Sequence, residues 1–592
     1  MPGPGDRGGV KQKPKNAKKT FRRLLKYMME YGLVFFVLIL FAFASNIGNL
    51  LGPGFAGKAI NEASAGKGNV DMQAVVRYGL LMLFAYVGSN ILSFLVNIGM
   101  MRVGRSVARN LRRDVFHKLM DLPVGYFDKH MAGDIISRVS YDIDVVCVSL
   151  SSDIVQILTS LVTVAGSFIM MCVISPPLVL CMVFTIPVSV LFTRYMSKRT
   201  RPLYSERSRS YGEMNGFAEE MFTGQKTILA YAHEDQVCEE FSRINKKAAE
   251  AYRDADGLGM TMGPTIGMIS NFGLSAIGLG GAILYMYGIV GLGQISSFIL
   301  YSRKFSGPIN EISNIINEIF SALAAAERVF QLLDEDEEVK DIEEAAELKN
   351  AKGQIEVDSL EFGYLPEKTI LHDFNMKAYP GETVAIVGHT GAGKTTMVNL
   401  LMRFYDPWKG KICVDGRENR EYTMESLRKS YSMVLQDTWV FNGTIFDNIA
   451  YGKENATHEE VAEAAKAAHI HNYIMRLPGG YNTVISEDGG NISKGQKQLI
   501  TIARAMLYDT GMLILDEATS NVDTATERRV QDAMKKLMKG KTCFIIAHRL
   551  STIRNADNIL VMDHGDVIEQ GNHDELMDRK GAYYKLYRSQ FE

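Results

Sequence analysis

The sequence predicts a multidomain chain, in which an all-α domain of six membrane-spanning helices precedes an α/β domain with a phosphate-binding loop. Three observations predict this fold. Long uncharged apolar runs fill the first half of the 592 residues, alternating apolar segments follow from about residue 345, and one of those segments leads into GHTGAGKT. The net charge of −2 gives no reason to expect a nucleic-acid partner.

The domain boundaries follow from these changes of composition. We expect a basic tail over residues 1–30, a transmembrane domain over 31–330, a linker over 331–350 and a nucleotide-binding domain over 351–592. The six cysteines are scattered without the CxxC spacing of metal sites, so we interpret them as reduced thiols.

The transmembrane domain is predicted from stretches without Asp, Glu, Lys or Arg. A helix needs roughly 20 apolar residues to cross about 30 Å of hydrocarbon. Residues 31–57 and 78–101 each suffice for one crossing, and residues 154–193 and 257–302 each suffice for two. Pro176-Pro177 and the glycine-rich segment 288–293 divide the two longer runs, which gives six spans.

Basic residues predict the orientation of these spans. They are concentrated in the N-terminal tail and in two long connections, 102–153 and 194–256, whereas the other connections are poor in them. The positive-inside rule then places both termini in the cytoplasm of a multi-pass protein of the plasma (bacterial inner) membrane. The long connections are rich in helix-forming residues and are expected to extend the spans beyond the bilayer. A few polar residues lie inside the spans and either line a substrate path or bond neighbouring helices: Asn46, Asn49, Asn90, Asn97 and Gln156.

The strongest motif is GHTGAGKT, which matches G-x-x-x-x-G-K-[ST] directly after the strand-like TVAIV. Its glycines allow the backbone to wrap around phosphates, Lys394 neutralises the β- and γ-phosphates, and the Thr395 hydroxyl binds Mg²⁺. The predicted ATP-binding residues of this loop are Gly388, His389, Thr390, Gly391, Ala392, Gly393, Lys394, Thr395 and Thr396.

The second chemical element is MLILDE, an apolar strand that delivers Asp516 and Glu517 to its carboxyl end. We expect Asp516 to hold Mg²⁺ and Glu517 to polarise the attacking water. Together with the phosphate loop, these carboxylates predict an ATP hydrolase with ATP and Mg²⁺ as cofactors.

Between these two motifs lies ISKGQ, residues 492–496, at the start of a helix-forming segment. The chain carries the phosphate loop, then this segment, then the Asp-Glu pair. This order of motifs resembles that of the ABC transporter superfamily. The resemblance implies that Tyr364 stacks on adenine, that Gln436 senses Mg²⁺ and the γ-phosphate, and that His548 contacts the γ-phosphate. It also implies that a signature segment contacts the ATP of a partner subunit: Ser493, Lys494, Gly495 and Gln496.

The resemblance covers nearly the whole chain. Residues 128–135 and 217–227 look like the segments that couple the ATPase domain to the spans in exporters, and 520–523 resembles the D-loop. Six spans and one ATPase domain on one chain resemble bacterial drug and lipid exporters, whose half-transporters work as dimers. The implied mechanism is alternating access.

Lys494 departs from the family pattern, because the signature usually has glycine there. A lysine lacks the backbone freedom of glycine and places a Cβ near the phosphate. One interpretation is an outward-pointing, harmless lysine. The other is an impaired site in an asymmetric heterodimer, in which this chain supplies the catalytic glutamate; we favour the heterodimer and keep the homodimer open.

The leading functional prediction is ATP-driven export of a small amphipathic or apolar molecule, of the multidrug type. The 31 methionines suit a pocket for varied apolar cargo, although methionines also fill gaps and face lipid. The alternative within the class is a homodimeric lipid flippase or peptide exporter. A soluble ABC ATPase acting on ribosomes or DNA conflicts with six spans, and a nucleotide-gated channel is distinguished by conducting ions instead of showing cargo-stimulated ATP turnover.

Overall fold

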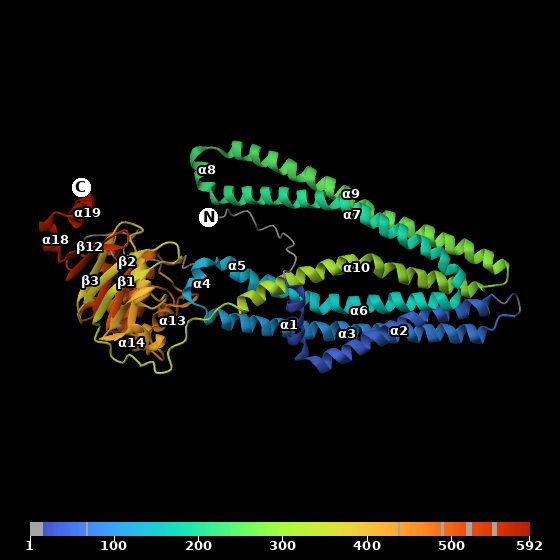
Figure 1. Ribbon diagram of the computed structural model, residues 1–592, viewed down its shortest axis with the longest axis horizontal. Helices are drawn as coiled ribbons and strands as arrows, with labels where there is room; N and C mark the ends of the chain where they lie inside the picture. The colour runs from blue at the N-terminus through green and yellow to red at the C-terminus, as the bar shows by residue number, and fades with distance from the viewer. Residues whose placement is uncertain are drawn as a thin grey trace. The chain divides into compact units, whose positions relative to one another are not determined.

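Figure 1 shows the chain in a computed structural model. The structure describes residues 16–64, 66, 69–435, 438–486, 491–516, 524–546 and 553–591. Their side chains are described except at residues 181–186, 189–190, 309–314, 317, 524–525 and 590–591. The chain forms two compact units, Met1–Leu122 with His130–Asp336 and Pro123–Lys129 with Glu337–Glu592.

Every regular element among the described residues of the first unit is a helix, and six of these helices are long. Its elements are α1 (Ala17–Met29), α2 (Gly32–Ala63), α3 (Met72–Met120), α5 (Ala132–Ser137), a π-helical turn (Arg138–Asp142), α6 (Ile143–Ile174), α7 (Pro176–Thr223), α8 (Gln225–Tyr231), α9 (Glu234–Met286) and α10 (Leu292–Leu333).

The helix breaks lie where the sequence predicts them. Pro176 begins α7 directly after the extended residue Ser175, and the glycine-rich segment separates α9 from α10. The helices run well past the apolar stretches into both long connections, which confirms that these connections extend the spans. Short connections join α2 to α3, α6 to α7 and α9 to α10, and we call the end of the bundle where they lie the short-loop end.

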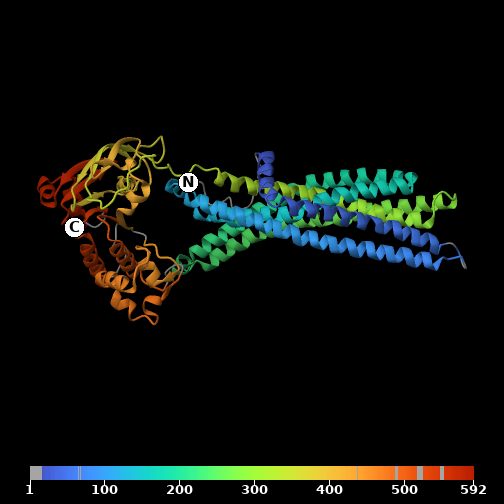
Figure 2. The same cartoon turned by 90° about the horizontal axis from the view of Figure 1, so that it is seen from below.

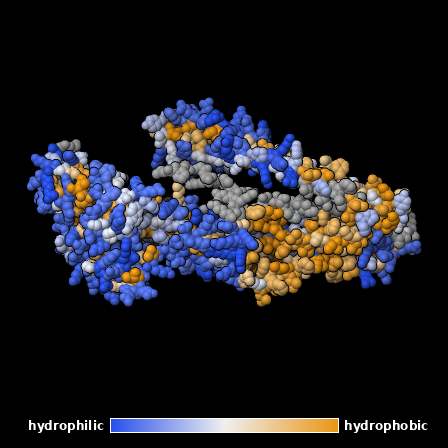
Figure 3. Space-filling model, viewed as in Figure 1, coloured by the Kyte–Doolittle hydropathy of each residue, from blue (hydrophilic) through white to orange (hydrophobic). Residues whose placement is uncertain are grey.

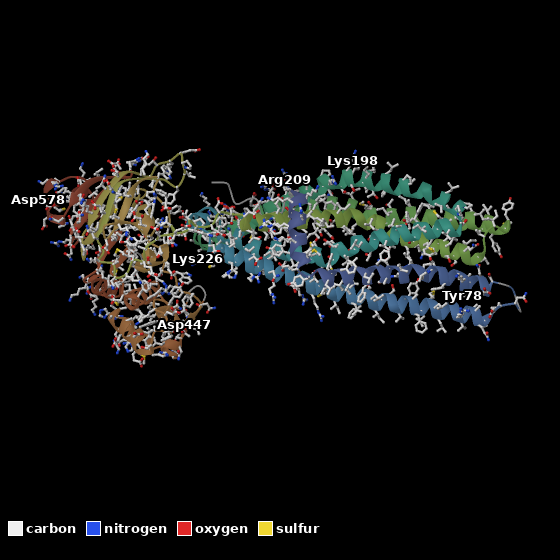
Figure 4. The ribbon with its side chains drawn as sticks, turned by 60° about the horizontal axis from the view of Figure 1, so that its bottom comes forward. Tyr78, Lys198, Arg209, Lys226, Asp447 and Asp578 are labelled. Atoms are coloured by element: carbon white, nitrogen blue, oxygen red, sulfur yellow. The ribbon has the colours of Figure 1, made fainter. Side chains whose placement is uncertain are left out.

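By length and composition, four of the described segments can cross a membrane: Gly32–Ala63, Met72–Met120, Ala132–Ile174 and Glu234–Met286. The other two long helices, α7 and α10, include side chains outside the described set. Apolar residues form a band over the part of the bundle nearer the short-loop end (Figure 3). Tyr78 lies near that end, whereas Lys198 and Arg209 lie farther along α7 (Figure 4).

The long helices form two groups. α2, α3, α6 and α10 pack along one another, while α7 and α9 pair with each other and diverge from the four away from the short-loop end (Figures 1 and 2). We call the diverging pair, with α8 at its tip, the α7–α9 arm. Within the four-helix group, the Thr163 hydroxyl on α6 donates to Asn46 Oδ1 on α2 over 2.7 Å. At Asn46, therefore, the hydrogen-bonding interpretation of the intramembrane polar residues holds.

The second unit is an α/β domain with one helix, α4 (Val124–Lys129), that comes from the first long connection. Its strands are β1 (Ile355–Phe362), β2 (Leu371–Ala378), β3 (Thr383–Gly388), β4 (Lys409–Val414), β5 (Arg417–Glu418), β6 (Tyr431–Val434), β7 (Gly443–Thr444), β8 (Val484–Ile485), β9 (Met512–Asp516), β10 (Thr542–Ile546), β11 (Asn558–Asp563) and β12 (Asp566–Gly571). Its other helices are α11 (Lys394–Leu401), α12 (Met424–Lys429), α13 (Ile445–Ala450), α14 (His458–Ala467), α15 (His471–Ile474), α16 (Lys494–Tyr508), α17 (Thr524–Met538), α18 (His573–Arg579) and α19 (Ala582–Phe591).

Two sheets organise the second unit. The larger has the order β12-β11-β3-β10-β9-β6 and is parallel except at β12, and the smaller is antiparallel with the order β2-β1-β4-β5. After an initial threonine, the central strands β3 and β10 are apolar and buried, as in parallel sheets that are covered on both faces. One core lies between the two sheets and around α11, and a second lies between the larger sheet and α13–α17. The predicted fold class is confirmed.

Candidate functional site

The phosphate-binding loop connects β3 to α11. Its three glycines have φ angles of +154° at Gly388, +88° at Gly391 and +101° at Gly393, a region that side chains disfavour. A Cβ at Gly388 would lie 2.2 Å from the carbonyl oxygen of Met562 on β11. A Cβ at Gly393 would lie 2.8 Å from Leu371 Cδ2. Only glycine fits at both ends of this turn.

Lys394 is buried at the first residue of α11, and its side chain folds back over the loop. Its Nζ donates to the carbonyl oxygens of Gly388 over 2.7 Å and His389 over 3.0 Å. The Lys394 ammonium is thus held inside the turn. The N-terminus of α11, where the helix dipole is positive, lies at the same place. The two threonines that follow differ, because Thr395 is exposed and Thr396 is buried. Of the two hydroxyls, that of Thr395 is therefore the accessible one.

The strands that precede the predicted catalytic residues end at one edge of the larger sheet. The parallel strands β3, β10, β9 and β6 all end at this edge, where Ile546 on β10 pairs with both Asp516 on β9 and Ile386 on β3. Asp516 is half-buried at the end of its strand. In the sequence, Glu517 follows β9 directly, and Gln436 and His548 follow β6 and β10 by two residues. These three lie outside the described residues, so their roles stay predictions.

Tyr364, the predicted adenine-stacking residue, sits in an aromatic cluster beside the loop. Its ring contacts Phe362 and Tyr405 edge-on, with centroids 5.3 and 5.0 Å apart. Asn399 Nδ2, one turn into α11, donates to the Tyr364 hydroxyl over 3.0 Å. The cluster therefore fixes the Tyr364 ring relative to the helix that carries Lys394.

The same cluster holds α4, which reaches this unit from the first long connection. The Tyr405 hydroxyl donates to the Asp128 carboxylate, and a Cβ at Gly125 would lie 3.0 Å from the Tyr405 ring. Burial and the Asp128 carboxylate both raise the pKa of Tyr405 above the usual tyrosine range. Sequence reasoning placed Asp128 in a coupling segment but missed Tyr405 and Asn399, because neither belongs to a motif.

The signature segment opens α16. Ser493 and Gln496 form a capping box, in which the Ser493 N–H donates to Gln496 Oε1 over 2.8 Å and the Gln496 N–H donates to Ser493 Oγ over 3.3 Å. Lys494 is exposed in the first helical turn, and Gly495 is buried. The backbone of Lys494 is right-handed helical, so the expectation that this position needs the freedom of glycine is wrong. The bulk and charge of the Lys494 side chain are the features that remain as reasons to expect an impaired signature.

Family models match both units of the chain. The ABC transporter transmembrane region matches residues 35–309, and the ABC transporter model matches residues 371–520. The chain is 44% identical over 524 residues to a fatty acid ABC transporter ATP-binding/permease protein of Mycobacterium tuberculosis. The aligned residues cover 88% of this chain and 82% of the mycobacterial protein.

Two further relatives are similar over almost their whole length. The chain is 35% identical over 584 residues to an ATP-dependent lipid A-core flippase of Methylobacillus flagellatus, with 97% of each chain covered. It also superposes, with a TM-score of 0.73 and 27% identity, on a bacterial Atm1-family ABC exporter with ATP bound. That match covers 97% of this chain and 99% of the exporter.

Proposed function

The chain belongs to the ABC transporter family as an exporter half-transporter that hydrolyses ATP, and on that premise we propose that its cargo is an amphipathic molecule with an acyl chain. The observation that carries the proposal is the similarity, over both units, to relatives whose names state fatty acid and lipid A-core as cargo. This narrows the multidrug prediction toward its lipid alternative. The methionines suit acyl chains as well as drugs, because thioethers adapt to flexible apolar ligands.

In the proposed ATP site, each residue has a separate task. Lys394 binds the β- and γ-phosphates, and Tyr364 stacks on adenine. Thr395 and Asp516 fit Mg²⁺, since hydroxyl and carboxylate oxygens suit this hard cation and the Thr395 hydroxyl is accessible. Bound Mg²⁺ neutralises charge that develops on the phosphates. Glu517 takes a proton from the attacking water.

Gln436 and His548 complete the proposed site. We assign Gln436 to sensing Mg²⁺ and the γ-phosphate, and His548 to holding the γ-phosphate oxygens. Both assignments are supported by their positions just after β6 and β10, strands that end at the same sheet edge as β3.

A dimer is expected of an ABC exporter half-transporter, and the α7–α9 arm supports it. Away from the short-loop end, the arm diverges from the other long helices of its own unit (Figures 1 and 2). Its tip carries exposed apolar side chains, among them Phe222 at 78% and Tyr231 at 73% exposure. A second half-transporter is the natural partner for such a surface.

We propose a heterodimer, with both termini in the cytoplasm and the spans in the plasma membrane of a bacterium. Lys494 supports the heterodimer through its size and charge, since its exposed side chain stands in the signature that faces the partner's ATP. The phosphate loop, Asp516 and Glu517 of this chain are complete, so it supplies the hydrolysing site. A homodimer is the competing outcome.

Reconstitution tests the proposed function. The chain is purified alone and with the half-transporter encoded next to it, placed in inside-out liposomes, and assayed for ATP-dependent accumulation of radiolabelled oleate and of the drug dye Hoechst 33342. We expect oleate accumulation by the pair and little by this chain alone. Accumulation of the dye without oleate would restore the multidrug function, and full activity of this chain alone would show a homodimer.

A further inference from the structure

Two adjacent cations, Arg303 and Lys304, interrupt the apolar sequence of α10. The helix begins at Leu292, so only eleven residues precede Arg303, about 17 Å of helix at 1.5 Å per residue. Because a span needs about 30 Å of apolar helix, the crossing made by α10 is not complete before these residues. With the crossing counted from Leu292, both cations are therefore placed within the bilayer, near its middle.

Neighbouring helices place polar groups at the same depth. Asn49 lies fourteen residues before the end of α2, and Tyr86 lies fourteen residues after the start of α3, each about 21 Å from the short-loop end. Lys304 lies about 18 Å from that end by the same measure. The residues thus form one layer across three helices.

Lys304 is half-buried in this layer. Its Nζ donates to Asn49 Oδ1 over 3.1 Å and lies 5.8 Å from the centroid of the Tyr86 ring. Tyr86 fits there because Gly52 lies opposite, where a Cβ would be 2.2 Å from Tyr86 Cζ. An ammonium has three N–H donors. Its two contacts here, the amide oxygen of Asn49 and the ring of Tyr86, are both uncharged groups. The positive charge of Lys304 is positioned but not neutralised by these contacts.

Arg303 lies on the open side of the same turn. Its side chain is exposed, as is Gly307 one turn further on, and a Cβ at Gly307 would meet nothing within 4 Å. Within the described side chains, neither Arg303 nor Lys304 forms an ion pair with a carboxylate. The sequence explains why, since residues 31–61, 72–113, 154–205 and 257–310 contain no Asp or Glu. The next acidic residue along α10 is Glu311.

We propose that Arg303 and Lys304 form a binding site for the anionic head of an acyl-chain amphiphile, at mid-depth in the membrane domain. An uncompensated charge in the bilayer is costly, and it is typically kept where it serves binding or transport. A carboxylate or phosphate accepts charge-assisted hydrogen bonds from a guanidinium and an ammonium together. The acyl chain then occupies the apolar surroundings of this layer.

This site deepens the proposed export of an acyl-chain cargo and rests on it. It narrows the cargo to anionic amphiphiles, with either a fatty-acid carboxylate or a phospholipid phosphate as head group. A purely structural role for Lys304, as a tie between α10, α2 and α3, predicts instead that the charge of the ligand is irrelevant to binding.

The test measures binding of three radiolabelled probes to the purified transporter dimer in nanodiscs of phosphatidylcholine, with empty discs subtracted. The probes are oleate, dioleoyl phosphatidic acid and oleyl alcohol, which has the same chain as oleate without the charge. The variants are Arg303→Gln, Lys304→Gln and the charge-preserving Lys304→Arg. Arg77→Gln, which removes an exposed cation near the start of α3, is the matched control.

We expect Arg303→Gln and Lys304→Gln each to weaken binding of the anionic probe about tenfold or more, as loss of a charge-assisted hydrogen bond does. Oleyl alcohol should bind each variant as it binds wild type, and Lys304→Arg and Arg77→Gln should retain oleate binding. The stronger of the two anionic probes identifies the head group. Equal losses for oleate and oleyl alcohol, or no loss with Arg303→Gln, would overturn the site.

The binding test of this site and the export assay in liposomes can succeed or fail separately. If the charge-selective binding is lost in the variants but wild type moves no oleate in liposomes, the site stands and the proposed export function fails. If wild type exports oleate and Arg303→Gln exports and binds it equally well, the export function stands and the site fails.

Discussion

Tyr405 connects α4 to the nucleotide site, and Tyr405→Phe isolates that connection. The substitution removes only the hydroxyl that donates to Asp128 and keeps the ring that packs on Tyr364. A hydrogen bond to a charged group contributes about 1.5–3 kcal/mol when buried. Asp128 is exposed, so water replaces part of this, and we expect a loss of about 1 kcal/mol.

A loss of that size corresponds to about a fivefold change in an equilibrium between docked and undocked α4. The assay is the ratio of cargo-stimulated to unstimulated ATP hydrolysis by the reconstituted transporter. We expect the ratio to fall in Tyr405→Phe and in Asp128→Asn, by up to about fivefold. The double variant should fall no further, because both changes remove one interaction.

Tyr379→Phe is the matched control, since Tyr379 is 62% exposed in the same unit. The raised pKa of Tyr405 keeps its phenol protonated and donating through the range of pH 6 to 9, so ionisation of this residue should not change the ratio there. If the effects of Tyr405→Phe and Asp128→Asn multiply in the double variant, the two side chains do not act through their hydrogen bond and the reasoning is refuted.

Three further predictions follow from local geometry. Lys394→Ala should weaken ATP binding by about tenfold or more, because it removes the cation held inside the loop, whereas Lys535→Ala on α17 should not. Equal ATP affinities of the two variants in fluorescence titrations would contradict the phosphate-loop assignment. Gly52→Ala should lower the melting temperature in detergent, by overpacking costing about 1–3 kcal/mol against Tyr86, while Gly88→Ala, whose Cβ meets nothing within 4 Å, should not. N-ethylmaleimide at pH 7.5 should modify the exposed Cys238 and spare Cys543. Burial raises the pKa of Cys543 to about 12, so that almost none of it is the reactive thiolate. Equal labelling of the two cysteines by mass spectrometry would contradict this.

The coarse fold could be predicted because its signals are local. Uncharged runs of the length of a bilayer mark the spans, and a proline and a glycine-rich segment mark the turns between them. The phosphate loop was recognisable for the same reason, since its glycines are required by backbone angles within eight consecutive residues. Chemistry that is encoded within one short segment is visible in the sequence.

Features that depend on distant contacts were not predictable. Tyr405 and Asp128 are 277 positions apart, and nothing in either segment indicates that they meet. In the sequence, Arg303 and Lys304 simply follow the uncharged run 257–302, and their depth along the span could be inferred only once the start of α10 at Leu292 was known. The argument from backbone freedom at Lys494 failed because the position is the first turn of a helix, where any L-residue fits.

The central claim is that ATP hydrolysis at Glu517 of this chain drives export, and ATP turnover by a Glu517→Gln transporter tests it most directly. The reconstituted dimer carrying Glu517→Gln is compared with wild type and with Glu463→Gln, which alters an exposed carboxylate on α14. We expect ATP to bind normally while hydrolysis and oleate accumulation both fall about 100-fold or more, as loss of a general base predicts. Hydrolysis within about threefold of wild type would contradict the account.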